Sequence, residues 1–147
     1  MKRRTFIKGT VVAGLASVTL APNAFAKWSE ENFTAKDVDA ALAGIEATKA
    51  EVSDKIKIKA PEIAENGMVV PITVTSEIEG TTSISIVIAK NPTPLVAVYE
   101  FGENAIPSVK NRVKMGKSSD VIAIVKAGDK VYKNHVAIKV TKGGCGG

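Results

Sequence analysis

Ser83-Ile84-Ser85-Ile86-Val87-Ile88 is the stretch that decides the fold. Its three isoleucines alternate with serine, serine and valine, and successive side chains of a β-strand point to opposite faces of a sheet. Isoleucine and valine are β-branched, and such residues favour strands because they pack well on a pleated surface. The pattern predicts a β-strand here, bounded by Gly80 on one side and by the turn sequence Asn91-Pro92-Thr93-Pro94 on the other.

Runs of the same kind occur on both sides of this stretch, and turn sequences such as Glu65-Asn66-Gly67 and Ala127-Gly128-Asp129 separate them. About seven short strands with regular turns are typical of a β-sandwich. The sequence therefore predicts a mainly β fold, an immunoglobulin-like antiparallel β-sandwich. Pro71 lies inside one run and cannot donate to a strand ladder, so we expect an edge or a bulge there. The predicted strands begin near Ile56, Met68, Ile84, Leu95, Ser108, Val121 and Val131.

One stretch before the strands, Asn32–Thr48, has helical periodicity. Thr34, with Asp37 three residues later, resembles a capping box at a helix start. We expect one N-terminal helix packed against the sandwich. The apolar residues that share one face of this helix are Val38, Leu42 and Ile45.

The first residues of the sequence are typical of an export signal. Arg3 and Arg4 precede an apolar run over 9–20 and the small-residue motif Ala24-Phe25-Ala26. This run is too short to span a membrane, which takes roughly 20 apolar residues. The twin arginine, with Phe6 and Lys8, resembles the signal that exports folded proteins. The alternative is an ordinary secretory signal. In both cases we expect residues 1–26 to be removed and the mature protein to be periplasmic, with no membrane attachment.

The net charge of the predicted mature chain excludes nucleic acid as a partner. The formal net charge is +5, but residues 1–26 contain four basic side chains and no acidic ones, which leaves 16 basic against 15 acidic side chains. A nearly neutral chain has no basic footprint for nucleic acid. The remaining length predicts one sandwich domain over residues 27–142.

The sequence ends Gly143-Gly144-Cys145-Gly146-Gly147, and Cys145 is the only cysteine. Glycine populates both halves of φ space, so we expect residues 143–147 to form a flexible arm that carries one thiol. If fully extended, the three residues from Lys142 to Cys145 reach about 10 Å. A single cysteine in an exported protein indicates intermolecular pairing or a reactive thiol. One cysteine and one histidine are too few for a structural zinc site, so we expect no metal.

Three features together resemble the SoxY family, the carrier subunits of the bacterial Sox thiosulfate-oxidising system. They are the final glycines around Cys145, the segment Glu65-Asn66-Gly67-x-x-Val70-Pro71-Ile72, and Asn91-Pro92-x-Pro94. The resemblance implies that Cys145 carries sulfur intermediates covalently, that Gly143, Gly144, Gly146 and Gly147 form the arm, and that the chain itself is not an enzyme and needs no cofactor. It also implies a heterodimer with a SoxZ-like subunit, and visits to a Sox cytochrome, a hydrolase and a sulfur dehydrogenase.

Other interpretations of the residues remain open. His135 could activate the thiol as a Cys–His pair, although a surface histidine on the last strand is the simpler interpretation. Lys139 and Lys142 could attract anions or could be ordinary strand-end charges. The chain could also be an exported structural domain that dimerises through a Cys145 disulfide, a carrier activated at the Gly146-Gly147 carboxylate, or a periplasmic thiol enzyme.

Overall fold

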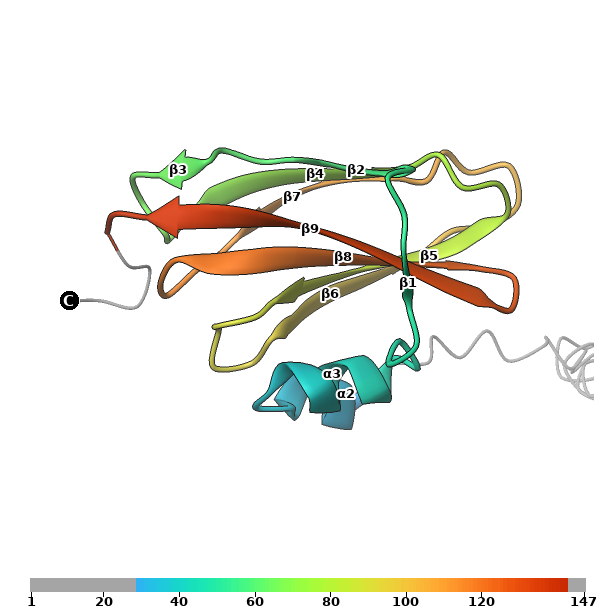
Figure 1. Ribbon diagram of the computed structural model, residues 1–147, viewed down its shortest axis with the longest axis horizontal. Coiled ribbons are helices and arrows are strands. Elements are labelled where there is room, and N and C mark those ends of the chain that lie inside the picture. The colour runs from blue at the N-terminus through green and yellow to red at the C-terminus, as the bar shows by residue number, and fades with distance from the viewer. Residues whose placement is uncertain (1–28, 143–147) are drawn as a thin grey trace, which may run out of the picture.

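A computed structural model describes residues 29–142. Within this range the chain forms two β-sheets that face each other, with two short helices on the outer side of the larger sheet (Figure 1). The prediction of a mainly β sandwich is confirmed. The predicted signal peptide with Arg3 and Arg4, and the predicted arm with Cys145, lie outside the described residues.

The larger sheet has the strand order β1-β9-β8-β5-β6, and β3 pairs with a second part of β9. The smaller sheet has the order β2-β4-β7. Most pairs are antiparallel, but β1 and β3 run parallel to β9. The strands of the larger sheet are β1 (Glu51–Val52), β3 (Ile63–Ala64), β5 (Thr81–Ile88), β6 (Leu95–Glu100), β8 (Ser119–Ala127) and β9 (Lys130–Val140). Those of the smaller sheet are β2 (Ile56–Lys59), β4 (Val70–Ser76) and β7 (Ser108–Val113).

All seven expected strands are present, and the sequence missed only β1 and β3 among the described residues. Each of these two strands has two residues, which is too short to show any periodicity. Both are fixed instead by backbone pairing with β9.

The strand β5 is buried on both faces. Its isoleucines lie in the core between the sheets, together with residues of the smaller sheet such as Ile72 and Val74. Val87, on the opposite face, packs in a second core with Ile124 and the helix residue Ala41. Burial on both faces explains why β5 contains no charged residue. The fold therefore has three layers, with the small sheet, the large sheet and the helices stacked in that order.

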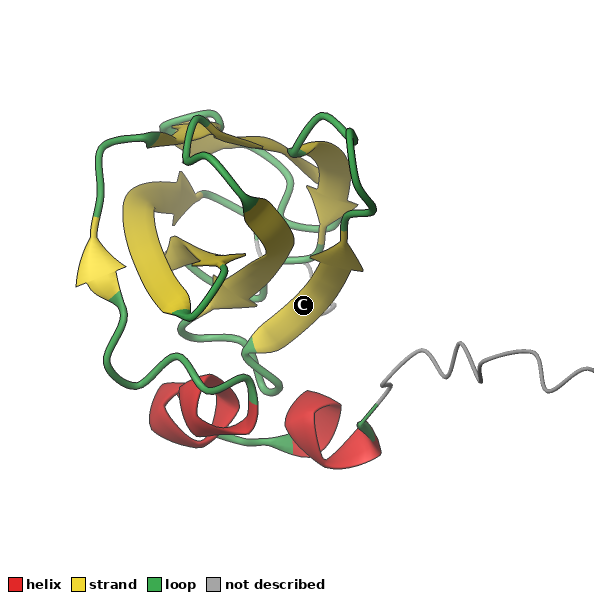
Figure 2. Cartoon of the chain, turned by 90° about the vertical axis from the view of Figure 1, so that its right-hand side faces the viewer, coloured by secondary structure: helices red, strands yellow, loops and turns green. Residues whose placement is uncertain are grey.

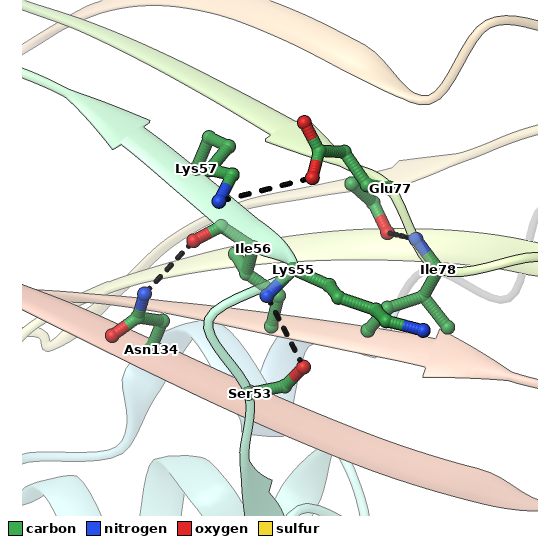
Figure 3. Close-up of polar contacts among 8 residues, drawn as sticks. Ser53, Lys55, Ile56, Lys57, Glu77, Ile78 and Asn134 are labelled. Atoms are coloured by element: carbon green, nitrogen blue, oxygen red, sulfur yellow. Dashed lines mark hydrogen bonds and ion pairs between the residues drawn. The ribbon is translucent and has the colours of Figure 1, made fainter.

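The two open sides of the sandwich are each bridged by an asparagine. Asn134 Nδ2 on β9 donates to the carbonyl of Ile56 on β2 at 2.8 Å (Figure 3). Asn111 Nδ2 on β7 donates to the hydroxyl of Tyr99 on β6 at 2.7 Å. Viewed end-on, the two sheets curve around one interior, with the helices below them (Figure 2). The bridges join the edges of the two sheets where no strand ladder connects them.

The single predicted helix is two helices, α2 (Glu30–Thr34) and α3 (Val38–Gly44). The prediction that a helix starts at Thr34 is wrong, because Thr34 is the last residue of α2. Asp37 has extended backbone angles, and its side chain accepts a hydrogen bond from Ala40 N at 2.8 Å. An N-cap of this kind begins a new helix and interrupts the old one. The expected apolar face is nevertheless correct, since Ile45 is buried in the second core.

The position of Pro71 in the sheet also differs from the predicted one. It lies in β4, the middle strand of the smaller sheet, and not in an edge strand. The partner β2 pairs only with Thr73 to Ser76, so Pro71 faces no strand on the β2 side. On the other side it is paired with Arg112 of β7. Proline is tolerated in this middle strand because its neighbour β2 is short.

No helix among residues 29–142 has the length and apolar character needed to cross a membrane.

We predict that Ile86→Ala lowers the free energy of unfolding by about 2–5 kcal/mol, because Ile86 is fully buried and its loss leaves a cavity between the sheets. Urea denaturation measures this change. The matched control is Ile106→Ala, at a side chain that is 81% exposed, with an expected change of no more than about 0.5 kcal/mol. Equal effects of the two substitutions would contradict the assigned core.

Candidate functional site

The predicted arm follows directly after β9, so the end of this strand is the base of the arm. Hydrogen bonds hold this end on both sides. On the β3 side, Lys139 N donates to Glu62 O at 2.9 Å and Thr141 N donates to Ala64 O at 3.1 Å. On the β8 side, Val140 N donates to Ser118 Oγ at 2.9 Å. The backbone is therefore tied to two neighbouring segments up to Thr141.

Gly67 extends this attachment by one residue. Its N–H donates to the carbonyl of Lys142 at 2.8 Å, and its own carbonyl accepts from Met115 N at 2.7 Å. Asn66 shapes the turn, since its Oδ1 accepts from Met68 N at 2.9 Å. The turn Glu65-Asn66-Gly67 thus joins the base of the arm to the segment after β7. The sequence singled out this turn, but it did not reveal that the turn holds the end of β9.

Asn91 performs a similar role for the neighbouring loops. Its Nδ2 donates to Lys114 O at 2.7 Å, and its Oδ1 accepts from Gly116 N at 3.2 Å. The β5–β6 loop is thereby joined to the β7–β8 turn. Both connections lie at the same end of the sandwich as the end of β9 (Figure 1). The two motifs Glu65-Asn66-Gly67 and Asn91-Pro92-x-Pro94 therefore both stabilise the end of the sandwich from which the arm extends.

Cys145 and the four glycines lie outside the described residues, and so does the geometry of the thiol. The structure does describe the point at which the predicted arm begins. Lys142 is the last described residue, is exposed, and precedes Cys145 by three residues. Because three residues span at most about 10 Å, the position of the thiol is limited to a small region around this end of the sandwich.

His135 is exposed on β9, opposite Ile122 of β8. It precedes the end of the strand at Val140 by five residues, which corresponds to about 17 Å along an extended backbone. Lys142 lies two residues beyond Val140 and therefore farther still from His135, whereas three residues from Lys142 to Cys145 reach at most about 10 Å. These lengths favour the surface interpretation of His135 and argue against a Cys145–His135 pair within one chain.

Several lysines surround the base of the arm. Among residues 29–142 the ion pairs are Lys57–Glu77 and Lys126–Glu46, and neither lies at this end. Exposed charges of this kind are screened beyond about 10 Å, so they attract a nearby anion without forming a closed site. No cluster of metal-ligating side chains is found in the described part of the chain. The exposed lysines at this end are Lys90, Lys114, Lys117, Lys139 and Lys142.

A family sequence model described as "Sulfur oxidation protein SoxY" matches residues 40–145. The chain belongs to the SoxY family. The match includes the whole sandwich, both asparagine motifs and Cys145 itself. The family assignment therefore agrees with the resemblance found in the motifs.

One solved structure supports the SoxY assignment, and a second shares the fold. The sulfur carrier protein SoxY from Chlorobium limicola f thiosulfatophilum is 40% identical, with a TM-score of 0.66 over 77% of this chain and 99% of that chain. A superoxide reductase (neelaredoxin) from Ignicoccus hospitalis is 18% identical, with a TM-score of 0.53 over 69% of this chain and 90% of that one. The second likeness concerns the fold alone. A search of curated proteins found no match.

We predict that Asn91→Ala lowers the free energy of unfolding by about 1–3 kcal/mol, because the carbonyl of Lys114 and the amide of Gly116 lose their side-chain partner. Denaturant unfolding checks this value. Asn104→Ala, in the loop at the opposite end, is not a suitable control because Asn104 has a positive φ of 64°. The control is Thr93→Ala in the same loop as Asn91, for which we expect a change of about 0.5 kcal/mol or less.

Proposed function

We propose that the protein is a covalent carrier of sulfur intermediates in periplasmic thiosulfate oxidation, with Cys145 as the attachment residue. The observation that carries this proposal is the SoxY family match, which extends through Cys145. The firmly held end of β9 supports it, because a carrier needs a thiol close to a stable body that partner enzymes can recognise.

The chemistry follows from the thiol. A thiolate is a good nucleophile toward sulfur. Joining the Cys145 thiol to thiosulfate forms one S–S bond, releases one proton and transfers two electrons to an oxidant. The oxidant is the cytochrome partner that the family resemblance implies. The product is a cysteine S-thiosulfonate. Hydrolysis of its terminal S–S bond by water then releases sulfate and leaves a persulfide on Cys145.

We propose that the chain itself does not catalyse these steps. A general base must lie within hydrogen-bond reach of the group that it activates. The one histidine of the sequence is too far along β9 to meet this condition within one chain. Oxidation and hydrolysis are then the work of separate enzymes, and the glycines around Cys145 allow the thiol to enter their active sites. We also propose that the twin arginine, Arg3 and Arg4, directs export to the periplasm.

We predict that Cys145→Ser abolishes thiosulfate-dependent electron transfer in a reconstituted Sox system. The free energy of unfolding should change by no more than about 0.5 kcal/mol, because a glycine-rich segment at a chain end normally buries little surface. Mass spectrometry of the wild-type protein after turnover should show a sulfur adduct on Cys145. A disulfide dimer alone would indicate the structural domain considered above, a C-terminal thiocarboxylate would indicate activation at Gly147, and retained activity of Cys145→Ser would contradict the carrier proposal.

We further predict a stable heterodimer with a SoxZ-like subunit. Co-expression should yield a one-to-one complex on size exclusion. Reductant should leave this complex intact while it separates any dimer linked through Cys145. A purified chain that stays monomeric, and that shows no heat of binding when it is titrated with the SoxZ-like subunit, would contradict the partner proposal.

A further inference from the structure

Exposed apolar side chains gather beside the base of the arm. In the described range, six large apolar side chains are exposed, and three of them fall within the short segment 63–69. Ile63 is 57% exposed, Met68 50% and Val69 53%. The other three, Val52, Val98 and Ile106, are separated along the chain. Single exposed apolar residues are common on protein surfaces, but a concentration of them marks an interaction site.

This segment is attached directly to the last residues before the arm. Ile63 is the pairing partner of Lys139 in the parallel β3–β9 ladder. Gly67, whose N–H binds the carbonyl of Lys142 at 2.8 Å, is followed at once by Met68 and Val69. The three exposed side chains are therefore held by the same hydrogen bonds that hold the end of β9. We call Ile63, Met68 and Val69 the collar.

The length of the arm determines how close an enzyme must come. A fully extended chain from Lys142 to Cys145 covers about 10 Å. A specific protein interface buries roughly 800 Å² on each partner and is much wider than this arm is long. An enzyme that encloses the thiol in an active-site cleft therefore rests on the sandwich surface immediately around Lys142. The collar is part of that surface.

We propose that the collar is the docking surface for the enzymes that act on Cys145, and that it binds an apolar rim at the entrance of their active sites. This inference rests on the proposed carrier function. Methionine is unbranched and adaptable, and it is favoured on surfaces that bind several partners. Such a surface suits a carrier that visits more than one enzyme. Exposed charges of both signs flank the collar, with Lys139 and Lys142 beside Glu62 and Glu65, so a polar rim surrounds the apolar side chains, as in typical protein interfaces.

The test places a charge on the collar and a matched charge elsewhere. Met68→Glu and Val69→Glu are compared with Ile106→Glu, which changes an exposed apolar residue of the β6–β7 loop. Each variant is combined with the SoxZ-like subunit, and thiosulfate-dependent cytochrome reduction is measured against carrier concentration. We expect the collar variants to raise the KM for the carrier at least tenfold, with kcat within twofold of wild type. For Ile106→Glu we expect KM and kcat both within twofold.

Two further measurements separate docking from other effects. The rate at which a small thiol reagent labels Cys145, and the midpoint of thermal unfolding, should be unchanged in all three variants. If Met68→Glu fails to fold, the neutral variant Met68→Gln replaces it, with an expected rise in KM of at least threefold.

A collar variant with the same KM as Ile106→Glu would overturn the proposal. Loss of the one-to-one complex in a collar variant would also overturn it, because the collar would then be the subunit interface. Self-association of the wild-type chain that the collar variants abolish would assign the collar to a second copy and overturn it as well.

The Cys145→Ser variant is measured in the same series. If it retains activity, the carrier proposal itself is wrong. If it is inactive while the collar variants behave like Ile106→Glu, the carrier proposal stands and only the collar proposal is wrong.

Discussion

The burial of β5 on both faces is the constraint on which the rest of the structure depends. Its isoleucines require the smaller sheet above them, and Val87 requires a cover on the opposite face, which α2 and α3 provide. A strand with two apolar faces is stable only between two layers, since either face would otherwise remain in water. In the larger sheet β8 pairs with β5 and β9 pairs with β8, so the position of β9 also depends on β5.

The held end of β9 connects this architecture to the function. A thiol on a long disordered chain would search a large volume, and an enzyme would gain little by binding the body of the carrier. Here the chain is tied to Ser118, Ala64 and Gly67 within its last described residues. In the carrier function that we propose, binding energy between this surface and an enzyme would serve to position the sulfur of Cys145. The firm attachment of the arm and the exposure of the collar are two consequences of the same turn.

The errors of the sequence-based expectations have local physical causes. Helical periodicity continued through Asp37, but this residue's carboxylate captures a backbone amide and starts a second helix. Pro71 indicated an edge strand, because the sequence could not show that the neighbouring strand β2 ends before it. The strands β1 and β3 carry no pattern of their own and exist only through their pairing with β9. In each case the deciding partner lies outside the window in which periodicity can be recognised.

The sequence by itself determined the mainly β fold, the seven longer strands and the SoxY resemblance. Alternation of side chains is a local property of the backbone, and the motif around Cys145 is contiguous. Only the tertiary structure decided that Glu65-Asn66-Gly67 and Asn91-Pro92-x-Pro94 lie together at the end of β9, and that Met68 and Val69 lie exposed beside Lys142. These relations join residues about 25 to 75 positions apart through backbone hydrogen bonds and register, which leave no periodic signal in the sequence.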